Sequence, residues 1–176
     1  MAHVLFANAA NLVHIDRLLT DIFNACGQSA PNLGVDSYGQ MDYHHKIQIL
    51  VLNRYNPDFD LQKALDSIVS NGVIIMNADE LSYAGIKLTR PMRLITYGYN
   101  PKSTITASSV VVHENISLQC CIQRQFDTLC GAALEPQEFS VRTSYMELKE
   151  DDVLAAVTIA LLSSVPAHKI SNMKPA

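Results

Sequence analysis

The first hundred residues alternate short, continuously apolar runs with segments of helical periodicity. Continuous apolar strands separated by helices are typical of a parallel β-sheet that is covered on both faces. We therefore predict a three-layer α/β fold with a mostly parallel sheet. The four strands expected in this sheet are Val4–Ala7, Lys46–Leu52, Gly72–Asn77 and Met92–Tyr97.

The segments between these strands predict helices and one loop. Apolar residues recur at helical spacing over Leu12–Ala25, and Gly27 stands where a glycine commonly ends a helix. Asp60–Ser70 predicts a short helix, and Ala78–Ala84 predicts one helical turn. Gln28–His45 is polar and contains Gly, Asn and Ser, which favours a loop.

After residue 100 the pattern changes to alternating and β-branched residues without intervening helices. Ser103–His113, Ile116–Arg124 and Phe139–Tyr145 predict a small antiparallel sheet. Asp151–Ser163 predicts a final helix, because its acidic first turn suits the helix dipole. His168–Ala176 is expected to be a frayed tail.

The length of 176 residues suits one sizeable domain. We expect a single domain over residues 1–170. It would contain a parallel core (1–100), antiparallel strands (101–148) and a C-terminal helix (150–165), followed by a tail (171–176).

Composition restricts the function classes. Apolar residues make up 48% of the chain and the net charge is −4, which argues against binding nucleic acid by phosphate neutralisation. There is no signal-peptide pattern and no apolar run long enough to span a membrane. The four cysteines form no C-x-x-C pair, and we expect buried free thiols in a reducing, cytoplasmic setting. They are Cys26, Cys120, Cys121 and Cys130.

The turn between the first strand and the first helix, residues 7–11, is where a P-loop would carry G-x-x-x-x-G-K-[ST]. The glycines of that motif let backbone N–H groups approach phosphates, and its lysine reaches the β- and γ-phosphates. This turn contains no Gly, Lys, Ser or Thr. The chain therefore has a P-loop-like order of elements without the residues that bind phosphate.

Four stretches together resemble the central, ATP-binding domain of the Mur ligase family. They cover most of the chain in the family's order. Val4–Gly27 matches its strand, loop and helix, Val51–Asp60 (VLNRYNPDFD) resembles T-N-I-x-x-D-H-L-D, Gly72–Gly98 resembles V-x-N-A-D-D…T-Y-G, and Asp152–Ile170 resembles the N-x-L-A-A helix through Leu154–Ala156.

The resemblance implies ATP-dependent joining of an acid to an amino acid and a role in peptidoglycan biosynthesis. It implies nucleotide-binding positions at Asn8, Asn11, Asn77 and Asp79. The alternative for the last two is structural: Asn77 would end a strand, and Asp79 would cap a short helix.

Several positions depart from the family pattern. Ala10 stands in place of the phosphate lysine and Asn11 in place of the magnesium-binding Thr or Ser, while Phe6 and Ala9 replace glycines. Asp58 replaces a metal-site histidine.

Further along the chain, Asp152 replaces the asparagine of the last helix. Three features of the family have no counterpart in this sequence. They are the stretch that contains the catalytic glutamate, the carbamylated lysine, and the two flanking domains. We therefore assign no catalytic residue.

These departures lead to three functional hypotheses. The first is a degenerate Mur-ligase-like protein without ligase activity that acts by binding, as a homodimer or with a Mur-ligase-like partner. The second is an ATP-dependent amide ligase, or ligase subunit, with non-standard nucleotide binding. The third is an unrelated α/β binding or regulatory protein. Fold alone does not decide among them.

Two further pairs of residues are candidate ion sites. Asp58 and Asp60 could hold a metal, although two carboxylates without a triphosphate bind Mg²⁺ weakly. Arg90 and Arg93 flank a strand and could hold an anion; a solvated rim is the alternative. The cofactor expectation is therefore at most weak binding of ATP and Mg²⁺.

Overall fold

The computed structural model describes residues 3–8, 10–35, 46–83, 85–88 and 90–173. Its centre is an eight-stranded sheet with the order β10-β7-β6-β5-β4-β3-β1-β2, and a separate two-stranded sheet pairs β8 with β9. The strands are β1 (His3–Phe6), β2 (Asn32–Val35), β3 (Ile47–Leu52), β4 (Ile68–Asn77), β5 (Arg93–Tyr97), β6 (Ile105–Val112), β7 (Ile116–Ile122), β8 (Phe126–Asp127), β9 (Ala133–Leu134) and β10 (Gln137–Thr143). The helices are α1 (Leu12–Ala25), α2 (Leu61–Ser67), the short 3₁₀ helix η1 (Leu81–Tyr83), α3 (Glu150–Leu162) and α4 (Ala167–Ser171).

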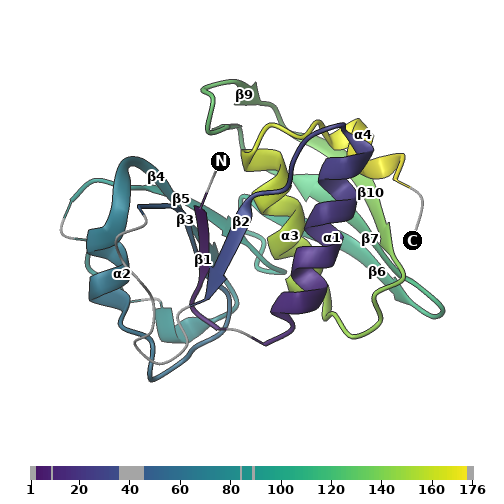
Figure 1. Cartoon of the computed structure of the whole chain (residues 1–176). Helices are drawn as coiled ribbons and strands as arrows, with labels where there is room; N and C mark the ends of the chain where they lie inside the picture. Colours follow the sequence, from purple (N-terminus) through teal and green to yellow (C-terminus); the bar gives the residue numbers. More distant parts are fainter. Residues whose placement is uncertain (1–2, 9, 36–45, 84, 89, 174–176) are drawn as a thin grey trace.

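The fold has three layers, as the alternating pattern predicts. Helices α1 and α3 lie side by side on one face of the sheet, and α2 covers the other face (Figure 1). The larger apolar core fills the α1–α3 side, and the smaller core lies between the sheet and α2. Strands β2, β1, β3, β4, β5 and β6 are parallel to their neighbours, so the expected parallel sheet is present.

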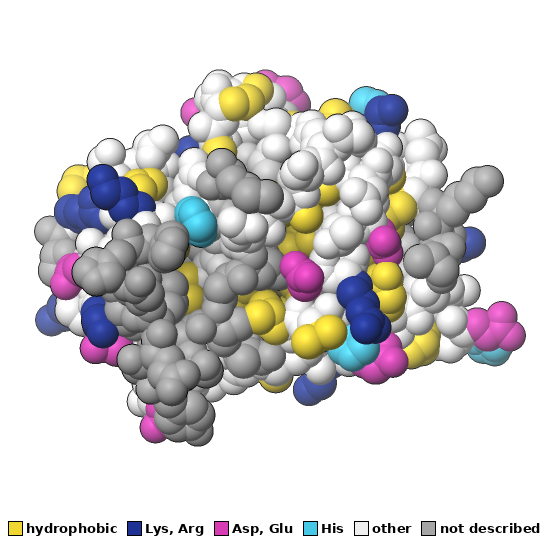
Figure 2. Space-filling model, viewed as in Figure 1, with side chains coloured by type: hydrophobic (Ala, Val, Ile, Leu, Met, Phe, Trp, Pro, Cys, Tyr) yellow, Lys and Arg dark blue, Asp and Glu magenta, His cyan; other side chains and the backbone are white. Residues whose placement is uncertain are grey.

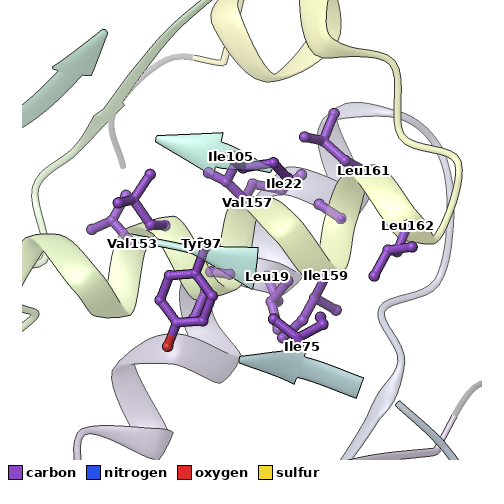
Figure 3. Close-up of a cluster of buried hydrophobic side chains, with 14 of the residues drawn as sticks. Leu19, Ile22, Ile75, Tyr97, Ile105, Val153, Val157, Ile159, Leu161 and Leu162 are labelled. Carbon is purple, nitrogen blue, oxygen red and sulfur yellow. The ribbon is translucent and has the colours of Figure 1, made fainter. Parts of the chain in front are cut away.

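Helix α3 is buried on all sides, because it lies between the sheet and α1. Every residue from Asp152 to Leu162 is buried. The aliphatic side chains of α3 meet those of α1 and of the central strands in one cluster (Figure 3). Small residues such as Ala155, Ala156 and Ala160 let α3 approach its neighbours closely. Burial on every side explains why the helix has no polar stripe.

The antiparallel strands follow the parallel core, as predicted, and they extend the same sheet. Strand β6 pairs with β5 in parallel and with β7 antiparallel, and β10 pairs with β7. In β7 the alternate residues Ile116, Leu118, Cys120 and Ile122 are buried. This alternation places one apolar face of the antiparallel strands against α3 and α4.

Two predicted segments are partly wrong. The segment predicted as a loop, Gln28–His45, contains β2, which pairs with β1 in parallel; residues 36–45 lie outside the described part. The helix predicted over Asp60–Ser70 ends at Ser67, and Ile68 already begins β4 with an extended backbone. Ile68 is buried beside α2, as a helical residue would be, so the apolar spacing did not distinguish the two conformations.

The predicted tail, His168–Ala176, contains most of α4. Ala167 and Ile170 of α4 are buried, and the helix packs against β10 and α1. A short polar helix carries little periodicity, so only this packing reveals it. In the part of the chain that the structure describes, no helix is long and apolar enough to cross a membrane.

Candidate functional site

The strand order places a crevice at the carboxyl ends of β1 and β3. Strand β1 has β2 on one side and β3 on the other, so the chain reverses its direction of travel across the sheet at β1. In open α/β sheets, ligands bind outside the carboxyl ends of the strands at such a switch point. The residues that follow β1, β3, β4 and β5 therefore form the candidate site.

Three asparagines form hydrogen bonds at the crevice between β1 and β3. The backbone N–H of Asn8 donates to Asn53 Oδ1 (3.1 Å), and Asn53 Nδ2 donates to the carbonyl of Asn8 (3.2 Å). Asn56 Nδ2 donates to the carbonyl of Ala7 (3.1 Å), and Asn8 Oδ1 accepts from the N–H of Ala10 (2.9 Å). Side-chain amides of the chain itself therefore satisfy the backbone of this turn.

An acidic group from α3 lies against the start of α1. Asn11, the N-cap of α1, has a left-handed backbone (φ 61°), and its Nδ2 donates to Asp152 Oδ2 (2.9 Å). The same oxygen accepts the backbone N–H of Lys149 (3.0 Å). The side chain of Asp152 is 1% exposed. A buried carboxylate therefore stands beside the positive end of α1, where helix geometry favours an anion.

Arg54 neutralises this carboxylate. Its guanidinium lies 2.8 Å from Asp152 Oδ1 and 3.0 Å from Asp151 Oδ1. Burial alone would lower the pKa of Arg54, but the hydrogen bond to Asp152 and the charges of Asp151 and Asp152 raise it. Burial, reinforced by the charge of Asp152, raises the pKa of Asp151 above its ordinary value, and Arg54 partly opposes this shift. We call Asn11, Arg54, Asp151 and Asp152 the acidic network.

Tyr97 lies next to the acidic network, at the end of β5. The hydroxyl is buried and has no hydrogen-bond partner among the described residues. Its oxygen points away from the aliphatic side chains of the cluster (Figure 3). Burial, with the charges of Asp151 and Asp152, raises the pKa of Tyr97 well above its ordinary value. Tyr97 is therefore a neutral hydroxyl at neutral pH.

Asp79 binds the loop that follows β5, and Asn77 bonds to Asp79. The carboxylate of Asp79 accepts the backbone N–H groups of Tyr99 (2.6 Å) and Asn100 (3.0 Å), and Asn77 Oδ1 accepts the N–H of Asp79 (3.0 Å). Gly98, the residue before Tyr99, has φ +133°, and a Cβ there would collide with the Asp79 carboxylate. The structure thus brings these two predicted residues together with the glycine of the T-Y-G motif.

The remaining candidates lie elsewhere. Asp60 caps α2 by accepting the N–H of Lys63 (3.0 Å), and both Asp58 and Asp60 are exposed. Arg90 donates to the carbonyls of Ile68 and Leu65, while Arg93 donates to those of Asp127 and Thr128. The two arginines therefore bond to different segments. Among the described residues, no three His, Cys, Asp or Glu side chains gather as a metal site.

Sequence reasoning missed Arg54 and Asp151. Arg54 lies two residues after the buried strand β3, and it stands where the Mur ligase motif T-N-I-x-x-D-H-L-D has isoleucine. That substitution is a signal, because a charged residue at the end of a buried strand requires a partner. Its partner Asp151 lies 97 residues further along the chain, so the pairing depends on how α3 packs.

The comparisons with known proteins agree with this architecture. No family model matches the chain, and no curated protein sequence matches it. Among solved structures, a MurF from Acinetobacter baumannii superposes with a TM-score of 0.65 at 10% identity, over 99% of this chain and 46% of that one. This protein has a Mur-ligase-like fold.

Two other structures support the same assignment of the fold. An MPL ligase from Neisseria meningitides, described as a UDP-N-acetylmuramate:L-alanyl-gamma-D-glutamyl-meso-diaminopimelate ligase, gives a TM-score of 0.62 at 10% identity, over 99% of this chain and 66% of that one. MurF from Thermotoga maritima, in complex with ADP, gives 0.60 at 7% identity, over 99% and 49%. The chain spans about half the length of the MurF structures that it matches.

Cys130 differs from the buried thiol that the sequence suggests. It is exposed, whereas Cys120 is buried and Cys26 and Cys121 are intermediate; all four are free. The hydroxyls of Ser164 and Thr128 lie 3.0 and 3.2 Å from its sulfur. Hydrogen bonds from Ser164, then Thr128, lower the pKa of Cys130 to about 7.

We therefore expect Cys130 to react with iodoacetamide as a thiolate near neutral pH. The alkylation rate, followed by mass spectrometry, should reach half its maximum at about pH 7, and Ser164→Ala should move this midpoint upward. Cys121 should react more slowly, because burial raises its pKa. Cys130→Ser is the control that removes the fast reaction. A midpoint of about 8.5, the value of a free thiol, would contradict the prediction.

Proposed function

We propose that this protein is a Mur-ligase-like protein without ligase activity, which acts as a binding or interaction module. The observation that carries the proposal is the acidic network at the start of α1. Arg54 and the buried Asp152 form an ion pair beside the N-terminus of α1, where a bound phosphate would lie. Arg54 is the cation of the network, and it is already paired with Asp151 and Asp152.

Electrostatics support this proposal. Acyl-phosphate chemistry requires a cradle that orients the γ-phosphate and Mg²⁺ to neutralise its developing charge. The acidic network holds two carboxylates, Asp151 and Asp152, against one cation, Arg54, and the excess negative charge would repel a phosphate beside Asn11. Asp79, at the position that the resemblance assigns to nucleotide binding, already accepts two backbone N–H groups.

Three positions that depart from the Mur ligase pattern belong to this network, and two of them bond to the third. Asn11 replaces Thr or Ser, Arg54 replaces an apolar residue, and Asp152 replaces Asn. Asn11 and Arg54 both bond to Asp152. The substitutions thus form one internally satisfied arrangement, which supports a changed role for the crevice.

The second candidate is an ATP-dependent amide ligase, or a ligase subunit, with non-standard nucleotide binding. The similarity to a MurF structure that contains ADP favours it, together with the switch-point crevice. In either case we propose a cytoplasmic protein. A homodimer, a Mur-ligase-like partner and a peptidoglycan-related role belong to the same proposal.

Calorimetric titration with ATP, ADP and UDP-linked sugars, with and without Mg²⁺, tests the proposal. We expect ATP to bind no more tightly than about 1 mM, or roughly −4 kcal/mol. No ATP hydrolysis is expected, with or without amino acids. Micromolar, Mg²⁺-dependent ATP binding would favour the ligase hypothesis instead.

A matched variant tests the role of the carboxylate. The combination Ala10→Lys, Asn11→Thr and Asp152→Asn adds the phosphate lysine and removes the negative charge. It leaves Phe6 unchanged, because Phe6 is fully buried in the core. This variant should gain measurable ATP affinity and still show no turnover, because turnover also requires an acceptor amine held in position for attack. Phosphate release stimulated by an amino acid would contradict the assignment.

A further inference from the structure

Among the residues that the structure describes, no strand pairs with the N-terminal half of β5 on the side of β6. Strands β5 and β6 are parallel, and in the described chain their pairing consists of Tyr97 with Ile105. Strand β6 begins at Ile105, so it lies alongside the end of β5 and extends beyond it. Strand β7 is antiparallel to β6, so the chain after β7 runs past the start of β6. There the N–H of Gln123 donates to the carbonyl of Thr104 (2.8 Å).

An open cleft of about 390 Å³ occupies this position. Arg93–Ile95 of β5 form one wall, Arg124–Asp127 form the opposite wall, and Thr104 closes the end nearest β6. The Arg93 guanidinium donates to the carbonyl of Asp127 and so connects the two walls at the other end. The cleft therefore lies where a further strand, in line with β6, would pair with β5. We call this position the slot.

The backbone of β5 presents hydrogen-bonding groups to the slot. The N–H of Thr96 donates to Thr104 Oγ1 (3.4 Å), and the N–H of Gly98 donates to the carbonyl of Ile105 (3.2 Å). These two residues thus face β6. Since successive residues of a strand alternate, the N–H and C=O of Leu94 face the same side and open into the cleft. An added strand can pair with such an edge.

Charge and exposure indicate what kind of strand would fit. Arg93 and Arg124 contribute two positive charges to the cleft, against one negative charge from Asp127. Arg124 is exposed, so its side chain is available to a ligand. The side chain of Leu94 is 45% exposed and provides an apolar contact beside the edge. Acidic groups flanked by β-branched residues complement this surface.

We propose that this cleft binds an extended acidic peptide of a partner protein, which pairs with β5 as a short strand in line with β6. The exposed part of β5 accommodates about three residues at roughly 3.3 Å per residue. The site lies at the opposite end of β5 from the acidic network. It is therefore separate from the switch-point crevice, and its test does not depend on nucleotide binding.

Fluorescence anisotropy with a fluorescein-labelled peptide of sequence TVEVET tests the proposal. The matched probes are TVKVKT, which reverses the charge, and TVEVET with an N-methylated central valine, which removes a backbone donor. Each change should weaken binding about tenfold or more. Arg124→Glu should do the same, whereas Arg142→Glu, an exposed arginine on β10, should leave affinity unchanged.

Amide hydrogen exchange provides the structural readout. The Leu94 amide should gain protection when TVEVET is bound, because it would then pair with the peptide backbone. Equal affinity for TVKVKT would overturn the proposal and indicate non-specific attraction. Insensitivity to N-methylation would also overturn it and indicate an anion site without strand pairing. Absence of binding up to roughly 1 mM peptide would also overturn it.

Discussion

Replacement of Arg54 by methionine is expected to lower the free energy of unfolding by about 3–5 kcal/mol. The methionine retains the apolar stem but leaves the carboxylate of Asp152, which is 1% exposed, without its cation. Asn11 and the N–H of Lys149 then remain as the hydrogen-bond partners of Asp152. Urea denaturation followed by circular dichroism measures the loss.

The double variant Arg54→Met/Asp152→Asn isolates the ion pair. It should recover much of the lost stability, because the neutral amide no longer requires a cation and can still bond to Asn11. Arg142→Met, at an exposed position, is the matched control and should change stability by no more than about 0.5 kcal/mol. If Arg54→Met behaved like Arg142→Met, the pair would not contribute to folding, and the carboxylate would have to be solvated or protonated.

Gly98→Ala is expected to destabilise the protein by about 2–4 kcal/mol. Two independent causes act at this position. The backbone has φ +133°, which side-chain-bearing residues rarely adopt, and the added Cβ would collide with the Asp79 carboxylate. Relief of the collision would break the hydrogen bonds from Tyr99 and Asn100 to Asp79. Thermal and urea unfolding measure the effect.

Gly85→Ala is the matched control for Gly98. A Cβ at Gly85 meets nothing within 4 Å. Its effect should lie within about 0.5 kcal/mol, or be slightly stabilising through the unfolded chain. Adding Asp79→Ala to Gly98→Ala removes the collision but not the strained φ, so it should recover part of the loss. Equal effects of the two glycine substitutions would show that the Asn77–Asp79–Gly98 contact is unimportant for stability.

Where a local pattern was strong, the sequence predicted the fold closely. Helix α1 has the predicted bounds, and Gly27 has the positive φ expected of a C-terminal glycine. The four core strands are present, because continuous apolar runs have few other ways to be buried. The resemblance to Mur ligases, drawn from short motifs, agrees with the superposed structures.

The candidate site was less accessible to sequence reasoning. Asn77 and Asp79 were singled out by a motif, and they do lie together with Gly98. Arg54 and Asp151 were not, because each is a common charged residue whose significance depends on a partner about a hundred positions away. The cleft beside β5 has no sequence signature at all, since it results from where β6 begins relative to its neighbour.

The sequence by itself determined which segments are buried and whether most are helix or strand, because periodicity and apolar content act locally. It also established that the first turn lacks the lysine and glycines of a phosphate loop. Only the tertiary structure decided the limits of β2, β4 and α4, since short segments take their conformation from the surfaces on which they pack. Packing also decided that Asp152 meets Arg54 and Asn11, because the approach of two helix ends at one edge of the sheet is a property of the whole fold.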